Sequence, residues 1–198
     1  MSSEGAYGDP STRSRILDAA WELVTEQGGR FKLSEVAARA GVSRQAVYLH
    51  FGDRGGLLVA LVQHMDDTLD LGESLAQVHA APDGASLLEA AMRLNTTFWA
   101  KVHPVAQVLE AAQHDDEALG AAWRNRMRFR HTTFRAMIEA LAGRGELDEE
   151  WSIDAAAATL FAVAHFDTWR ELVIELDWSD DLYVASMSRL LRRALLRP

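Results

Sequence analysis

Three side chains near residue 45 have the types and the spacing needed to read DNA bases. Arg44, Gln45 and Tyr48 fall in one short stretch, and at helical spacing they share one side of a helix. A guanidinium can pair with guanine and an amide with adenine, each adding about 1–3 kcal/mol of discrimination. A tyrosine hydroxyl suits a phosphate contact, which sets the position on the duplex without reading the sequence. The pattern therefore predicts a helix that enters the major groove.

Two short helices and a tight turn would have to position these side chains. Residues 33–40 repeat apolar side chains at helical spacing, which predicts one apolar helix face. Gly41 can end that helix in the left-handed conformation, and Ser43 can cap a second helix over residues 44–50. A helix held from behind by another in this way is a helix-turn-helix. The alternative is an ordinary helical corner, since similar turns occur in many enzymes.

The rest of the chain also predicts helices. Alanine and leucine dominate, there are only four prolines, and runs of β-branched residues are nearly absent, so the class is all-α. The predicted helices cover residues 12–27, 33–40, 44–50, 53–78, 86–102, 104–113, 116–142, 153–176 and 180–196. These nine helices form a three-helix head, a connecting fourth helix and a five-helix body. We expect a DNA-binding domain over residues 1–54, with a disordered arm at 1–10, and a ligand-binding and dimerisation domain over 55–198.

The negative charge of the chain lies in the predicted body. Residues 1–58 hold seven Lys/Arg and seven Asp/Glu, whereas residues 59–198 hold thirteen Lys/Arg and twenty-two Asp/Glu, which accounts for the whole net charge of −9. A neutral head can still bind phosphates if its basic groups share a face, while an acidic body is repelled by DNA. The distribution predicts a single orientation of approach and a salt-sensitive affinity.

The first 60 or so residues resemble the TetR family of bacterial transcriptional repressors. The resemblance lies in Ala40-Gly41-Val42-Ser43, followed by Val47-Tyr48 and His50-Phe51, with Ile16, Ala19-Ala20, Gly28, Val36-Ala37, Arg54 and Leu57-Leu58 around them. It implies a helical fold of about this length, an operator-binding dimer and a pocket for a small molecule. The chain departs from the family pattern at Gln45, Lys32 and Gly55, where a small residue, a hydroxyl and an acid are usual.

The resemblance and the spacing together give the candidate DNA-binding residues. We expect base contacts from Arg44 and Gln45, phosphate contacts from their neighbours, and a packing or capping role as the better interpretation of His50. The predicted set is Lys32, Ser43, Arg44, Gln45, Tyr48, His50 and Arg54.

The body is expected to hold an effector and to form a homodimer. Six tryptophans are many for this length, and aromatic side chains of the predicted body helices could enclose a small, mostly apolar or aromatic molecule. The predicted pocket residues are Asn95, Phe98, Trp99, His103, Trp123, Met127, His165, Phe166 and Trp169. Small and apolar residues in the last two helices predict a twofold interface at Ala158, Phe161, Leu182, Met187, Leu190 and Leu191. Effector binding would then shift the dimer away from its DNA-binding state.

Several other classes of protein are excluded by what the sequence lacks. It has no cysteine, no His-x-x-x-His pair, no glycine-rich phosphate loop and no Gly-x-Ser-x-Gly turn, so we expect no catalytic residue, cofactor or metal site. No apolar stretch approaches the length of a membrane span, and a cytoplasmic location is expected. The competing interpretation is a ligand-binding or scaffold protein with weak or lost DNA binding. Repression and activation both need the same head, and the sequence does not separate them.

Overall fold

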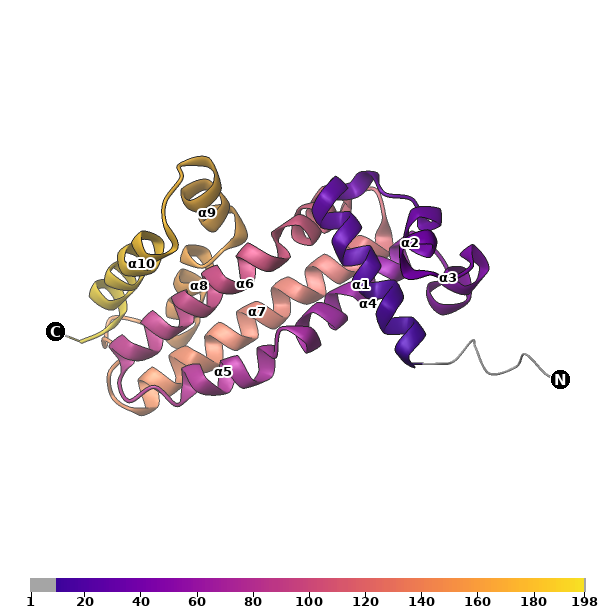
Figure 1. Ribbon diagram of the computed structural model, residues 1–198. Coiled ribbons are helices and arrows are strands. Elements are labelled where there is room, and N and C mark those ends of the chain that lie inside the picture. Colours follow the sequence, from indigo (N-terminus) through magenta and orange to yellow (C-terminus); the bar gives the residue numbers. More distant parts are fainter. Residues whose placement is uncertain (1–9, 198) are drawn as a thin grey trace. The chain divides into compact units, whose positions relative to one another are not determined.

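The computed structural model describes residues 10–197, and these fold into helices arranged as two compact units (Figure 1). The first unit contains residues 10–69 and 102–125, and the second contains residues 70–101 and 126–197. Helices α6 (Gly84–Ala112) and α7 (Glu117–Gly143) contribute residues to both. The all-α class is confirmed. The predicted arm at residues 1–10 lies outside the described residues except for Pro10, which begins α1.

The first unit is built on α1 (Pro10–Gln27), α2 (Leu33–Ala40), α3 (Arg44–Phe51) and α4 (Arg54–Thr68). Each of these helices repeats apolar residues at helical spacing and turns them toward the others. The fully buried side chains include Ile16, Leu17, Val24, Val36, Val47, Leu57 and Leu58. This shared core fixes α3, so its outer face is presented by a packed scaffold.

The turns around α3 are set by local hydrogen bonds. Gly41 ends α2 in the left-handed conformation, with φ 66°. The Ser43 hydroxyl accepts a hydrogen bond from the Ala46 N–H at 3.1 Å, and the Asp53 carboxylate accepts one from the Gly56 N–H at 2.8 Å. A Cβ at Gly56 would lie 2.1 Å from the Phe51 carbonyl oxygen. Glycine at this poor helix-forming position is therefore required by the close approach of α3 to the start of α4.

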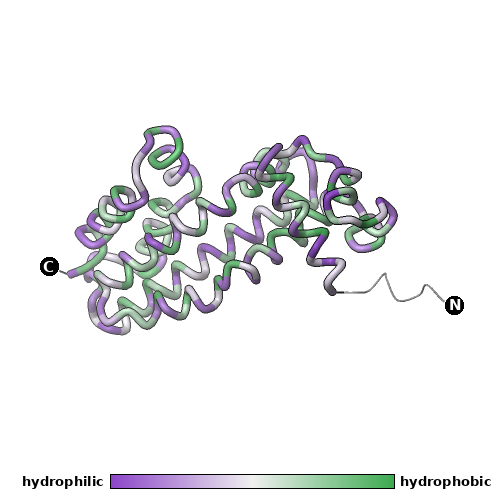
Figure 2. Tube along the Cα trace, in the orientation of Figure 1, coloured by the Kyte–Doolittle hydropathy of each residue, from purple (hydrophilic) through white to green (hydrophobic). Residues whose placement is uncertain are grey.

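The second unit packs α5 (Leu71–His79), α8 (Ile153–Val163), α9 (Phe166–Trp169) and α10 (Asp180–Leu195) with residues 84–101 of α6 and 126–143 of α7. Hydrophobic positions alternate with hydrophilic ones along these helices (Figure 2). Its core includes the fully buried side chains Leu87, Leu88, Met92, Ile138, Leu141, Leu160, Tyr183, Leu191 and Leu195. One antiparallel bridge joins Leu147 to Leu196 and fixes the C-terminal end of α10.

Three helix boundaries differ from the prediction. The helix predicted over 53–78 ends at Thr68, and Asp70 takes the left-handed conformation (φ 47°, ψ 43°) before α5 begins. Aspartate is one of the few residues besides glycine that tolerates this conformation. Because the break occurs at a polar residue, the spacing of the hydrophobic residues does not reveal it. The helices predicted over 86–102 and 104–113 are one continuous helix, α6, with Pro104 inside it. Proline removes one backbone donor there without ending the helix.

The helix predicted over 153–176 is broken after Val163. The His165 ring accepts a hydrogen bond from the Asp167 N–H at 3.3 Å and caps the short α9, which continues into a π-helix over Arg170–Glu175. A π-turn is wider than an α-turn, so the apolar spacing of this segment does not predict which residues face inward.

Candidate functional site

The outer face of α3 carries the three side chains predicted to read DNA. Arg44, Gln45 and Tyr48 are exposed, while Ala46 and Val47 are buried against the core of the first unit. An Arg44 Nη donates a hydrogen bond to the Tyr48 hydroxyl at 3.0 Å, and the guanidinium lies over the tyrosine ring, 5.4 Å from its centre. This contact holds Arg44 extended along the helix and lowers the entropy that it would lose on binding a base.

Contacts from α1 and α2 hold this face in place. The Glu35 carboxylate accepts a hydrogen bond from the Lys32 N–H at 2.8 Å, which closes the start of α2 and leaves the Lys32 side chain exposed. Arg39 donates two hydrogen bonds to Glu26, at 2.7 and 2.8 Å, and thereby joins α2 to α1. The hydrogen bond from Arg39 lowers the pKa of Glu26. Arg39 is thus a structural residue of the head.

Two residues of the predicted DNA-binding set, Arg54 and His50, have contacts within the first unit. The Arg54 guanidinium lies 4.8 Å from the centre of the Phe31 ring, and one of its Nη atoms donates to the Gly29 carbonyl at 2.8 Å. His50 is half-buried and its ring lies 5.8 Å from that of Phe51. The Arg54 guanidinium is therefore engaged in contacts within the first unit, and its contact with a phosphate stays a prediction. The packing role expected for His50 agrees with its position.

The predicted set omits one residue of the exposed face of α3 that carries Arg44, Gln45 and Tyr48, which we name the recognition face. Leu49 is 60% exposed and follows Tyr48 on α3. It lies four residues after Gln45, so helical spacing was a sufficient signal for it. An exposed apolar side chain here suits contact with the methyl group of thymine.

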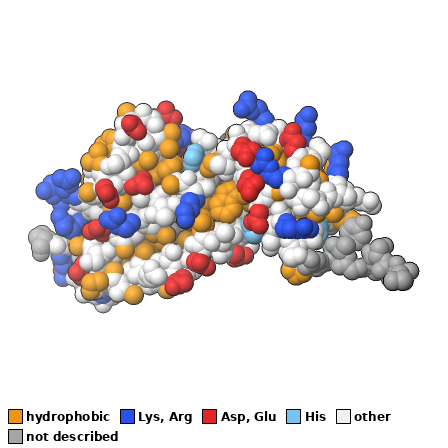
Figure 3. Space-filling view, viewed as in Figure 1, with side chains coloured by type: hydrophobic (Ala, Val, Ile, Leu, Met, Phe, Trp, Pro, Cys, Tyr) orange, Lys and Arg blue, Asp and Glu red, His pale blue; other side chains and the backbone are white. Residues whose placement is uncertain are grey.

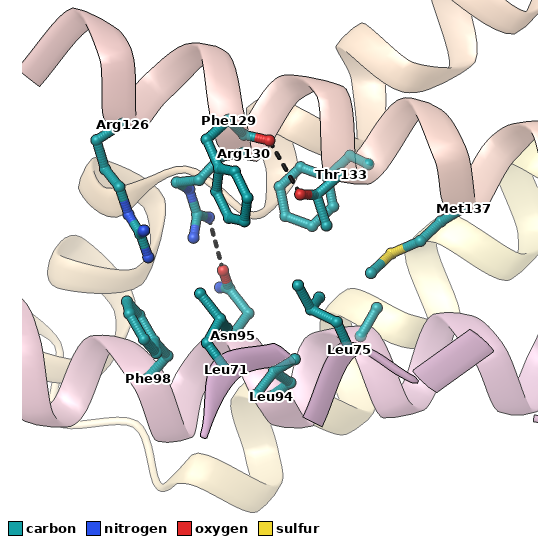
Figure 4. A pocket seen from close by; sticks show the side chains of 12 residues that line it. Leu71, Leu75, Leu94, Asn95, Phe98, Arg126, Phe129, Arg130, Thr133 and Met137 are labelled. Carbon is teal, nitrogen blue, oxygen red and sulfur yellow. Dashed lines mark hydrogen bonds between the residues drawn. The ribbon is translucent and has the colours of Figure 1, made fainter. Parts of the chain in front are cut away.

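A small cavity of about 40 Å³ lies in the second unit, between α5, α6 and α7 (Figure 4). Of the predicted pocket residues, Asn95 and Phe98 line it. The other ten lining residues are outside the predicted set, which did not separate α5 from α4. The lining residues are Leu71, Leu75, Ala91, Leu94, Asn95, Phe98, Arg126, Phe129, Arg130, Thr133, Phe134 and Met137.

Arg130 is the most unusual of the lining residues, since it is charged and only 8% exposed. Its guanidinium donates to the Asn95 Oδ1 and to the Ala164 carbonyl, both at 2.8 Å, and lies 4.4 Å from the centre of the Trp99 ring. Burial lowers the pKa of Arg130 to about 9. The Asn95 amide donates in turn to the Tyr183 hydroxyl at 3.2 Å, and burial raises the pKa of Tyr183 to about 12. This hydrogen-bonded chain connects α7, α6 and α10.

The remaining predicted pocket residues do not line this cavity. Trp99, Phe166 and Trp169 form the aromatic core of the second unit, with the Trp99 and Phe166 ring centres 5.0 Å apart. His165 caps α9, and Met127 is half-buried outside the cavity lining. His103 and Trp123 belong to the first unit. The spacing of aromatic residues found a core, since large rings serve both purposes equally well.

The predicted interface residues are divided between surface and core. Leu182 is 46% exposed, Leu190 is 51% exposed, and Ala158 is also exposed. Phe161 and Met187 are half-buried. Leu191 is fully buried within the unit, so its assignment to a dimer interface is a correction. It packs on the inner side of α10, as the neighbouring Leu195 does.

Comparison with known proteins identifies the head. A family model described as bacterial regulatory proteins, tetR family, matches residues 16–61, from α1 into α4. The chain is 40% identical over 79 residues to the HTH-type transcriptional regulator SrpR of Pseudomonas putida, which covers 36% of this chain and 37% of SrpR. Residues 16–61 therefore carry the DNA-binding region of the TetR family, and the chain is similar to TetR-family regulators. TetR-family proteins are transcription regulators and not enzymes, in agreement with the sequence analysis.

Longer matches cover most of the chain at lower identity. The HTH-type transcriptional repressor BepR of Brucella suis biovar 1 is 24% identical over 173 residues, covering 77% of this chain and 76% of BepR. A protein of Saccharomonospora viridis described as a transcriptional regulator, solved in complex with choline, has a TM-score of 0.82 at 16% identity, covering 96% of this chain and all of that one. At this identity the likeness shows the fold alone. The chain spans well under two thirds of SrpR's length.

Two further properties of residues 10–197 bear on function. None of their helices is long and apolar enough to cross a membrane. No group of three His, Asp or Glu side chains within this range could hold a metal ion.

Proposed function

We propose that this protein is a ligand-responsive transcriptional regulator that binds a palindromic DNA operator as a homodimer. The observation that carries the proposal is the joint exposure of Arg44, Gln45, Tyr48 and Leu49 on a helix that α1 and α2 hold from behind. Bound to its operator the dimer would repress, and a small effector would release it. A DNA target places the protein in the bacterial cytoplasm.

Sequence reading is assigned to α3. Arg44 pairs with guanine, Gln45 with adenine, and Leu49 with a thymine methyl, while Tyr48 and Lys32 contact phosphates. One such helix reads too few base pairs to select a site in a genome. Two heads related by a twofold axis read two half-sites about 34–36 Å apart, or one helical turn more.

The dimer interface is assigned to the exposed faces of α8 and α10. Leu182 and Leu190 lie on the outer side of α10, and Ala158 on that of α8. Small residues on α8 allow close approach of the partner helix, and the leucines supply the apolar area. The four helices from two subunits would form the interface.

The effector site is assigned to the cavity between α5, α6 and α7. Because α6 and α7 also contribute residues 102–112 and 117–125 to the unit that holds α3, their backbone continues from the effector site into the DNA-binding unit. A coupling of about 1–3 kcal/mol between the two sites is the usual scale and changes DNA affinity by about 5–150-fold.

The proposal is tested by selecting duplexes from a random DNA pool with the full-length protein. We expect enriched sequences to be inverted repeats, and fluorescence anisotropy with a selected duplex to show an affinity that falls steeply with salt concentration. Recovery of no common sequence, together with weak binding at low salt, would contradict the proposal. The ligand-binding or scaffold protein without DNA recognition would then be the better interpretation.

A further inference from the structure

Arg130 is a buried cation that has only neutral hydrogen-bond partners in the structure. Among residues 10–197 its guanidinium donates to an amide oxygen, that of Asn95, and to a backbone carbonyl, that of Ala164. Its Nε–H is buried and has no partner among residues 10–197. No carboxylate is among the twelve residues that line the cavity. A guanidinium has five N–H donors, so part of the donor capacity of Arg130 is unused.

The surroundings of Arg130 disfavour its charge. Burial and the positive charge of Arg126 both lower the pKa of Arg130, and only Tyr183 acts in the opposite direction. The Ala164 carbonyl and the face of the Trp99 ring offer partial negative charge, and Ala164 is the C-cap of α8, where the helix dipole is negative. Buried charges are normally paired with an opposite charge, because desolvation is costly.

The cavity around Arg130 has a polar end and an apolar end (Figure 4). Arg130 and Asn95 lie at the polar end, with Arg126 reaching from α7 beside Phe98. Leu75 and Met137 lie at the other end. Arg130 and Met137 are seven residues apart on α7, which corresponds to about 10 Å along the helix axis. The arrangement is complementary to a molecule with one charged group and an apolar body.

We propose that the effector is an organic carboxylic acid whose carboxylate binds the guanidinium of Arg130. This inference rests on the proposed function, since it names the class of molecule that the effector cavity takes. A carboxylate matches the planar donors of arginine and can accept two hydrogen bonds at once. Its apolar body extends past Thr133 toward Leu75 and Met137. The choline bound to the Saccharomonospora protein is a cation, and a cavity with a buried guanidinium is not complementary to such a ligand.

The cavity must widen to admit the whole acid. A volume of about 40 Å³ holds little more than a carboxylate group, compared with 300 Å³ or more for typical ligand pockets. The lining residue Phe129 is 44% exposed, and hydrophobic side chains gather on the surface of the α5–α7 region in Figure 3. Phe129 can therefore move outward without leaving a packed core. Binding that requires such a change shifts the population of α7 conformations, as ligand-responsive regulation demands.

Two sets of matched probes test the charge preference. Benzoate and benzamide have nearly the same planar shape, as do the head groups of octanoate and octanamide, while benzylamine and octylamine have the same carbon skeletons but carry a cation. Calorimetry with the full-length protein measures the affinity of each. We expect the carboxylates to bind about tenfold to a hundredfold more tightly than the amides, the range for hydrogen bonds to charged groups, and the amines to bind weakest. Carboxylates that bind no better than their amides would overturn the inference.

Variants of the cavity connect this preference to Arg130. Arg130→Met is expected to remove the carboxylate preference, while Arg128→Met, an exposed arginine of the same helix, leaves it unchanged. If Arg130→Met fails to fold, Thr133→Glu replaces it as the test, because residue 133 lines the cavity one turn from Arg130. A carboxylate placed there should pair with Arg130, raise Tm above that of Thr133→Gln and abolish octanoate binding. Equal Tm values and unchanged octanoate binding would count against the inference.

The failure of this inference and the failure of the proposed function give different results. If an amide binds as tightly as the acid and weakens DNA binding, the result supports the effector cavity and contradicts the assignment of a carboxylic acid as the effector. If octanoate binds through Arg130 and leaves DNA affinity unchanged, the result supports the anion site and contradicts the coupling between the cavity and DNA binding.

Discussion

At the scale of residues, the recognition face depends on one intramolecular contact. Arg44 lies over the ring of Tyr48 and donates to its hydroxyl, so the guanidinium is already extended before it meets a base. Gln45 follows Arg44 on α3, and its amide is suited to reading an adenine next to the guanine that Arg44 would read. The two residues Gln45 and Tyr48 should therefore differ in what their loss does to DNA binding.

We predict that Gln45→Ala and Tyr48→Phe weaken DNA binding in different ways. Gln45→Ala removes a base contact, so it should cost about 1–3 kcal/mol on the selected operator and relax the preference at one base pair per half-site. Tyr48→Phe keeps the ring beneath Arg44 but removes the hydroxyl. The lost phosphate contact should weaken binding to all sequences, and the lost hydrogen bond from Arg44 should weaken the preference for guanine as well. Competition assays over operators with single base substitutions measure both effects. A uniform loss for Gln45→Ala would show that Gln45 reads no base.

The contrast between α3 and Arg130 shows which residues a sequence can predict. Helical spacing was enough to place Arg44, Gln45 and Tyr48 on one exposed face, because all three lie on one short helix. Arg130 depends on Asn95 and Ala164, which are 35 and 34 residues away along the chain. Nothing in the local pattern of α7 separates this arginine from its solvated neighbours. A site assembled from distant helices becomes visible only in the fold.

At the scale of elements, hydrophobic spacing found the helices but not all of their ends. It predicted α2 and α3 closely, because Gly41 and Ser43 are strong local signals for a helix end and a helix start. It missed the end of α4 at Thr68, before the left-handed Asp70, and the π-helix after Trp169, where the backbone changes without a change in composition. Local capping chemistry can be read from a sequence, whereas a break imposed by packing cannot.

We predict that Gly56→Ala destabilises the protein and Gly72→Ala does not. A methyl group at residue 56 would lie 2.1 Å from the Phe51 carbonyl oxygen, so the start of α4 must move away from α3. Such overpacking typically costs about 1–3 kcal/mol. At Gly72, within α5, a Cβ would meet nothing within 4 Å, and alanine should stabilise the helix by about 0.4–1 kcal/mol. Urea unfolding followed by circular dichroism measures both changes.

The opposite ranking of the two glycine variants would contradict this account of the α3–α4 junction. It would mean that α4 can shift freely at its first turn. A second measurement makes the result specific to the head, since Gly56→Ala should also lower operator affinity by moving the end of α3.

At the scale of the whole molecule, the charge distribution and the exposed apolar face of α8 and α10 both bear on DNA binding. The charge affects how the protein approaches DNA, and the apolar face is the proposed dimer interface. The net charge of −9 belongs to residues 59–198, so electrostatics steers the neutral head toward DNA and keeps the rest of the chain away from it. A neutral head gains little non-specific affinity from its charge. In the proposed dimer, tight binding would come from linking two heads, because the binding of one raises the effective concentration of the other.

We predict that Leu190→Lys dissociates the dimer and, through it, weakens operator binding. Leu190 is 51% exposed on α10, so lysine should be tolerated within one subunit, but a twofold axis would bring two such cations together. Sedimentation velocity should show a monomer of unchanged helical content, and operator affinity should fall by about a hundredfold or more as avidity is lost. Ala185→Lys is the matched control, because Ala185 is exposed on the same helix but lines a groove with α6. A Leu190→Lys protein that remains dimeric, beside an Ala185→Lys protein that dissociates, would move the interface from the α8–α10 face to the α6–α10 groove.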